Sequence, residues 1–198
     1  ILSTGMADEV DLQNVIDIFN SSNKRNISIL HCVSQYPAEY SKLNLNTINW
    51  LEEHYFHYTI GYSDHSLGTH IPVAAVARGA QIIEKHVTLD TSMKGTDHKG
   101  SADMNTFHQM MHDIRSLEFS MGEWDMFIDD SVSPAKKKLE RSLAIKNKLK
   151  VGDSIREEDL CMISPGDGYK WNDRDKFINK MVNRPIKPNT IVKDGLFY

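Results

Sequence analysis

The sequence predicts an α/β fold of parallel strands followed by a small β-rich module, and two observations carry this prediction. Four short apolar runs alternate with helical patterns at spacings of about 20 to 35 residues, which is typical of parallel strands joined by βαβ crossovers. The last 58 residues lose this alternation and show short strands between Gly, Pro and Asn turns. Four strand–helix units make half of an eight-stranded barrel, and a small open sheet is the alternative.

The elements follow in a regular order along the chain. Short apolar runs typical of buried strands occupy residues 1–2, 27–30, 58–62 and 80–86. Helical apolar spacing follows them at residues 12–19, 48–55, 73–77 and 104–121. Because the first run starts abruptly, we expect the chain to begin inside a domain, with the first four barrel strands missing before it.

The second part of the chain differs in composition. Residues 122–140 are rich in Asp, Ser, Pro and Lys without apolar periodicity, so we expect a linker there. Residues 141–198 contain a quasi-repeat, in which residues 149–160 resemble residues 186–196. The repeat predicts a small pseudo-symmetric β module. The expected domains are therefore residues 1–121 and 141–198, joined by the linker.

The composition argues against several classes of protein. The chain has 198 residues, with 23 Lys and Arg against 27 Asp and Glu, and its net charge of -4 lacks the basic excess that nucleic-acid binding needs. No stretch approaches the ~18 apolar residues of a membrane span, and no signal peptide is apparent. Cys32 and Cys161 lie far apart in apolar runs, which predicts reduced thiols in a cytoplasmic protein. We expect neither nucleic acid nor a membrane as a partner.

Polar side chains follow each apolar run, where the functional groups of parallel sheets and barrels collect. His65 and His86 each end a different run, so both imidazoles can converge on one end of the sheet and hold a catalytic divalent metal. Asp97 lies in the loop after the fourth run and can close over the same end. For either histidine considered alone, a hydrogen-bonded structural role is the alternative. The other polar residues at these ends are Ser3, His31, Ser34, Tyr36, Ser63 and Asp64.

The hydroxyls of Ser3 and Ser63 suit phosphate or carboxylate binding, because backbone amides of turns and helix starts can stand beside them. No Walker-type or G-x-G-x-x-G loop is present. A Ser-His-Asp hydrolase is disfavoured because the G-x-S-x-G elbow is missing.

Five motifs in this order resemble the sialic acid (N-acetylneuraminate) synthase family. The resemblance covers essentially the whole chain. It implies the C-terminal half of a (β/α)8 TIM barrel in residues 1–121 and an antifreeze-like (SAF, β-clip) domain in residues 141–198. The motifs are ILSTGM at 1–6, LHCVSQYP at 30–37, GYSDHS at 61–66, IEKHVTL at 83–89 and KGTDHK at 94–99.

The resemblance also implies an activity, the condensation of phosphoenolpyruvate with an N-acylated hexosamine to give a sialic acid-type nonulosonate and phosphate. His65 and His86 match ligands of a divalent metal, Mn²⁺ or Mg²⁺, that polarises the sugar aldehyde, and Asp97 matches an acidic residue near the sugar. Because the linker can span to a neighbouring subunit, we also expect a homodimer with domain swapping, in which the small domain covers the partner's strand ends. The family's phosphate-gripping lysines belong to the first barrel half, so we expect these 198 residues alone to be inactive.

Substrate contacts follow from the same motifs. Ser3 and Ser63 match positions that hold phosphoenolpyruvate, and Tyr36 matches a substrate-contacting tyrosine. Ser34 stands where the bacterial sialic acid enzymes often have Asn. Ser164 precedes Pro-Gly where the family usually presents an Arg to the partner's sugar, which leaves room for a related amino sugar.

Two other functions remain open at this point. One is a noncatalytic sugar- or partner-binding fragment, in which the antifreeze-like module recognises the ligand. The other is a metal-dependent hydrolase on a related barrel, for which only Asp64 and Asp97 offer further ligands. The presence of both His65 and His86 favours the synthase, because a binding module needs neither.

Overall fold

The computed structural model describes residues 1–22 and 26–197. The chain divides into two compact units, Ile1–Glu123 and Trp124–Tyr198. In the described part of the chain, no helix combines the length and apolar character that crossing a membrane requires.

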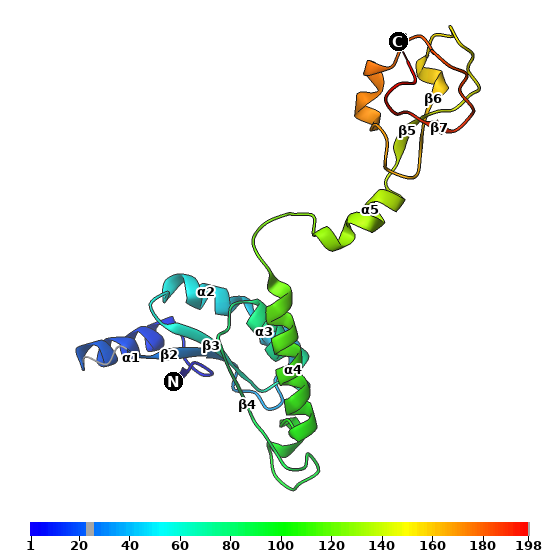
Figure 1. The fold of residues 1–198 in the computed structure, drawn as a ribbon. Coiled ribbons are helices and arrows are strands. Elements are labelled where there is room, and N and C mark those ends of the chain that lie inside the picture. Colours follow the sequence, from blue (N-terminus) through cyan, green and yellow to red (C-terminus); the bar gives the residue numbers. More distant parts are fainter. Residues whose placement is uncertain (23–25, 198) are drawn as a thin grey trace. The chain divides into compact units, whose positions relative to one another are not determined.

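The first unit is built on a parallel sheet of four strands, β1 (Leu2–Ser3), β2 (Ser28–Cys32), β3 (Thr59–Asp64) and β4 (Ile82–Lys85). The strands are adjacent in sequence order, β1-β2-β3-β4 (Figure 1). This confirms the prediction of an α/β fold with parallel strands.

One helix follows each strand, namely α1 (Glu9–Ser21), α2 (Asn46–His54), α3 (His70–Ala77) and α4 (Met104–Met121). The Asp8 side chain accepts a hydrogen bond from the Asp11 amide and caps α1, and Asp103 caps α4 in the same way. These helices begin where a side-chain acceptor satisfies a free backbone amide.

The core of the first unit lies between the helices and one face of the sheet. Ile29, Ile60 and Tyr62 from the strands pack against apolar side chains of α1, α2 and α3. Because side chains alternate along a strand, Ser63 and Glu84 lie on the opposite face. The core residues are Leu12, Ile16, Ile27, Ile29, Ile48, Leu51, Tyr55, Ile60, Tyr62, Ala75 and Ala80.

The second unit has its own core and an antiparallel sheet in the order β6-β5-β7. The strands are β5 (Ser142–Ile145), β6 (Leu160–Ile163) and β7 (Thr190–Ile191). The two copies of the quasi-repeat meet at Leu149 and Ile186, whose backbone groups exchange hydrogen bonds of 3.1 and 2.9 Å. The repeated segments therefore pair with each other across this unit.

The segment expected to be a linker contains a helix, α5 (Ser133–Leu139). Pro134 in the first turn suits a helix start, because proline has no amide hydrogen to leave unpaired. All residues of α5 are exposed, so no apolar periodicity could reveal it. The Lys137 carbonyl accepts a hydrogen bond from the Gly166 amide at 2.8 Å, which connects α5 to the loop after β6.

Candidate functional site

A cavity lies at the carboxyl ends of β3 and β4, where the loop between β4 and α4 folds over the sheet. It includes four of the residues singled out from the sequence, Tyr36, His65, His86 and Asp97. The complete lining consists of Tyr36, Pro37, Asp64, His65, His86, Thr96, Asp97, Lys99 and Gly100.

The two histidines face each other in this cavity. The ring centroids of His65 and His86 are 5.2 Å apart and their planes are nearly perpendicular, at 83°. The Tyr36 ring packs against both, with centroid distances of 4.0 Å to His65 and 5.6 Å to His86. Residues from three segments of the chain therefore meet at one point.

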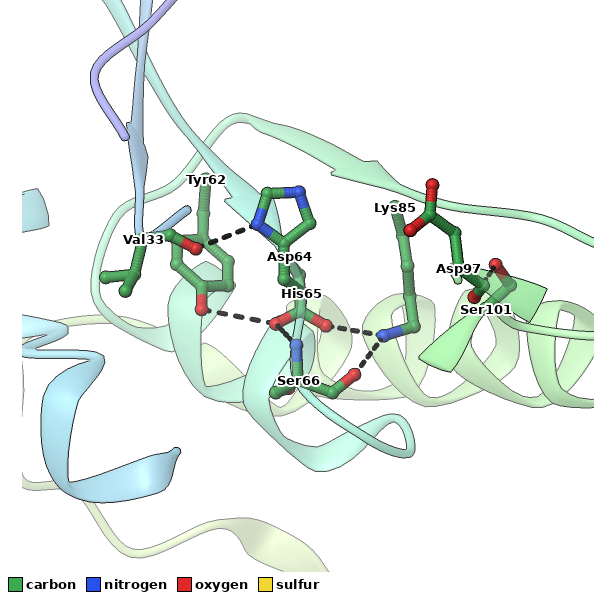
Figure 2. A network of polar contacts seen from close by, with 8 residues as sticks. All are labelled: Val33, Tyr62, Asp64, His65, Ser66, Lys85, Asp97 and Ser101. Atoms are coloured by element: carbon green, nitrogen blue, oxygen red, sulfur yellow. Dashed lines mark hydrogen bonds and ion pairs between the residues drawn. The ribbon is translucent and has the colours of Figure 1, made fainter. Parts of the chain in front are cut away.

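The tautomer of His65 follows from its hydrogen bond. Its Nδ1 lies 2.8 Å from the carbonyl oxygen of Val33 (Figure 2). A carbonyl only accepts, so Nδ1 carries the proton and donates it, and the lone pair of the neutral ring is on Nε2. A backbone acceptor on the far nitrogen is the usual support of a histidine that binds a metal. Nε2 of His65 is therefore suited to bind a metal ion.

His86 has a weaker polar neighbour. Its Nδ1 is 3.9 Å from a carboxylate oxygen of Asp97, and both side chains are partly exposed. The backbone of Asp97 is fixed by Ser101, whose hydroxyl donates to the Asp97 carbonyl at 2.8 Å. Among the described residues, no three His, Cys, Asp or Glu side chains form a metal-binding group. Two imidazoles with a nearby carboxylate are a partial ligand set.

Comparisons with known proteins identify the family. Residues 1–126 match the NeuB family. The chain belongs to the NeuB family. It is 33% identical to the N,N'-diacetyllegionaminic acid synthase of Campylobacter jejuni over 98% of this chain and 58% of that protein. It is also 29% identical to human N-acetylneuraminate-9-phosphate synthase, over 99% of this chain and 55% of that enzyme.

Other NeuB relatives support this membership. An uncharacterized protein of Methanocaldococcus jannaschii is 36% identical over 100% of this chain, and the chain spans 57% of its length. The N-acetylneuraminic acid synthetase of Leptospira borgpetersenii, solved with citrate, superposes with a TM-score of 0.61 at 34% identity, over 68% of this chain and 46% of that one. The chain thus spans a little over half the length of the curated relatives it matches, and its resemblance to sialic acid synthases is confirmed.

Three serines that the NeuB resemblance assigns to substrate binding lie outside the cavity lining. Ser3 and Ser34 are exposed, and the Ser34 amide donates to the Gly5 carbonyl at 3.3 Å. Ser63 is buried, and its hydroxyl donates to Glu84 Oε1 at 2.7 Å. An ionised Glu84 only accepts, so the Ser63 proton faces Glu84 in this state.

Ser164 belongs to the second unit, where its hydroxyl donates to the Leu139 carbonyl at 3.4 Å. Nζ of Lys170, in the loop that follows Ser164, forms an ion pair of 2.8 Å with Oε2 of Glu140. This pair lowers the pKa of Glu140, mainly through the hydrogen bond from Lys170.

Thr96 and Lys99 line the cavity but were not singled out from the sequence, and neither was Glu84, which lies outside the lining and accepts from the Ser63 hydroxyl. Glu84 could have been found from alternation, because it lies two residues before His86 and pairs in register with Ser63. Thr96 and Lys99 flank Asp97 in the same loop, but no pattern indicates which loop side chains turn toward a cavity.

His31 has a structural role. Its Nε2 is 2.7 Å from the Leu43 carbonyl, and burial lowers the pKa of His31 despite this hydrogen bond. The neutral ring donates its Nε2 proton to that carbonyl. His31 therefore connects β2 to the segment before α2.

Proposed function

We propose that the chain carries part of the active site of an enzyme that condenses phosphoenolpyruvate with an N-acylated hexosamine, giving a sialic acid-type nonulosonate and phosphate. The observation that carries this proposal is the convergence of His65, His86 and Tyr36 in one cavity at the strand ends. Its relatives include synthases of legionaminic, pseudaminic and N-acetylneuraminic acid derivatives, which supports this class of product.

The first unit is proposed to be one half of a (β/α)8 barrel. Its strands follow in sequence order, and core side chains from α1, α2 and α3 pack on one face, as in barrels. The first half would come from the full-length protein or a separate chain. The second unit is proposed to be an antifreeze-like domain that covers the strand ends of a partner in a homodimer, and its separate core supports a domain of its own.

We propose that His65 and His86, with Asp97 nearby, would supply part of the ligand set of a divalent ion, Mn²⁺ or Mg²⁺. Nε2 of His65 and the ring of His86 would hold it, with positions left for water and substrate. The bound ion would supply polarisation of the sugar aldehyde. The Val33 carbonyl keeps the proton on Nδ1 of His65, and Tyr36 holds both rings from one side.

In the proposed reaction, C3 of phosphoenolpyruvate forms a bond to the aldehyde carbon. Water then adds to C2, and phosphate leaves from C2, so the new keto oxygen comes from water. Ser63 must turn its single proton from Glu84 toward the anionic substrate to bind it, because phosphate and carboxylate oxygens only accept. Asp97 lies beside His86, where it can orient a hydroxyl of the sugar.

The test measures phosphate release by the full-length protein with phosphoenolpyruvate, Mn²⁺ and a panel of N-acylated hexosamines. His65→Ala and His86→Ala should each abolish Mn²⁺-dependent release with little change in fold. His112→Ala is the matched control, because the His112 side chain is 68% exposed on α4. Undiminished turnover in both cavity variants would remove the metal assignment, and no condensation with any sugar of the panel would refute the activity.

A further inference from the structure

A buried ion pair that includes the lining residue Asp64 lies at the cavity and has no part in the proposed reaction. Lys85 Nζ is 2.6 Å from Asp64 Oδ2, and their side chains are 1% and 0% exposed (Figure 2). Asp64 and Lys85 are the last residues of β3 and β4 and pair in register. The next residue after each of them is one of the two cavity histidines.

Further hydrogen bonds extend this pair into a network. Asp64 Oδ1 accepts from the Tyr62 hydroxyl at 3.2 Å and from the Ser66 amide at 3.0 Å. Lys85 Nζ also donates to the Ser66 carbonyl at 2.7 Å. Both oxygens of Asp64 are therefore used, and the residues immediately before and after His65 are anchored to the same lysine (Figure 2).

Stability alone does not account for such a pair. Removing two charges from water costs about as much as their attraction returns, so a buried ion pair is often no more stable than apolar side chains of similar size. What the pair provides is a defined distance between two points of the backbone. Here these points are the ends of the strands that present His65 and His86.

We propose that Asp64 and Lys85 are positioning residues, which fix the separation and orientation of the His65 and His86 imidazoles from the ends of β3 and β4. This inference rests on the proposed function of the two histidines. The link between β3 and β4 sets the distance, and the Ser66 contacts turn the chain so that Nδ1 of His65 meets the Val33 carbonyl.

The test measures the affinity of the full-length protein for Mn²⁺ alone. The electron paramagnetic resonance signal of the free ion reports how much Mn²⁺ remains unbound. The double variant Asp64→Asn with Lys85→Met cuts the link between the strands without leaving a buried charge, and its amide oxygen still accepts from Tyr62 and Ser66. We expect a loss of Mn²⁺ affinity of about tenfold or more, as for other residues that support metal ligands. The urea midpoint should fall only modestly, so that the variant stays folded in the binding assay.

Two companion variants sharpen this test. Asp64→Asn with Lys85→Gln restores an uncharged hydrogen-bonded link and should recover most of the affinity. Arg115→Gln with Glu118→Gln removes an exposed ion pair of 2.8 Å from α4 and should leave Mn²⁺ binding unchanged.

A folded Met double variant that binds Mn²⁺ as tightly as the wild type would overturn the positioning role. If that variant does not fold, Asp64→Glu decides instead, because it keeps the charge but shifts the carboxylate by one methylene. Unchanged affinity in a folded Asp64→Glu protein would equally overturn the inference, and weakened affinity would support it. Failure of the wild type itself to bind Mn²⁺ would instead refute the proposed metal site, and the positioning role with it.

Discussion

Replacing Lys85 alone with Met should destabilise the first unit more than replacing both members of the ion pair. In Lys85→Met the Asp64 carboxylate, 0% exposed, keeps the Tyr62 and Ser66 donors but loses the ammonium at 2.6 Å. Removing one member of a buried ion pair lowers the free energy of unfolding by about 3–5 kcal/mol. Because Asp64 keeps two hydrogen-bond donors, we expect a loss near the lower end, about 3 kcal/mol. Asp64→Asn with Lys85→Met leaves no charge and should cost about 1 kcal/mol.

The assay is urea unfolding read by hydrogen exchange of the β3 amides, so that the signal reports the first unit and not the second. The expected difference between the two variants is about 2 kcal/mol, which double-mutant comparison resolves readily. Equal stabilities would refute the reasoning, because they would mean that the Asp64 carboxylate reaches water or a new partner once Lys85 is gone.

Three further predictions concern the rest of the chain. Ser164→Arg should shift the relative kcat/KM of the full-length protein toward N-acetylmannosamine, because a guanidinium donates charge-assisted hydrogen bonds to an acyl oxygen. An unchanged ratio of kcat/KM between the sugars would exclude position 164 from the substrate site. Burial lowers the pKa of His31 in the fold, so the unfolded chain binds more protons, and stability should fall as pH drops below about 6.5. His31→Gln should flatten that fall in urea unfolding measured across pH. Gly61→Ala should destabilise the sheet by about 1–3 kcal/mol, because a Cβ at Gly61 would lie 2.4 Å from Leu30 Cδ2, and a thermal midpoint equal to wild type would contradict this.

The parallel sheet and its helices could be predicted because the spacing of apolar residues along the chain indicates which residues are buried. Runs such as residues 27–30 and 58–62 are short, mostly apolar and free of charged residues, as is typical of strands in a covered parallel sheet. The meeting of His65 and His86 followed from the same rule, since parallel strands present their carboxyl ends at one edge. Helix α5 escaped prediction because an exposed helix carries no apolar face.

For the polar residues around the histidines, the apolar pattern of the sequence does not show which face of the sheet each side chain occupies. Asp64, Glu84 and Lys85 are all charged residues near the carboxyl ends of two neighbouring strands. The register of β3 and β4 places these residues on opposite faces of the sheet. Asp64 pairs with Lys85 on the face that the helices cover, whereas Glu84 pairs with Ser63 on the other face.

A shift of one residue in the pairing of β4 with β3 would place Lys85 on the face of Ser63 and Glu84 on the face of Asp64. With the observed register, the ion pair of Asp64 and Lys85 lies on one face of the sheet, while the Ser63 hydroxyl and Glu84 carboxylate lie on the opposite face. Two neighbouring residues of one strand can therefore serve different purposes. Asp64 is proposed to hold the histidines in place, whereas the Ser63 hydroxyl donates to Glu84 on the opposite face.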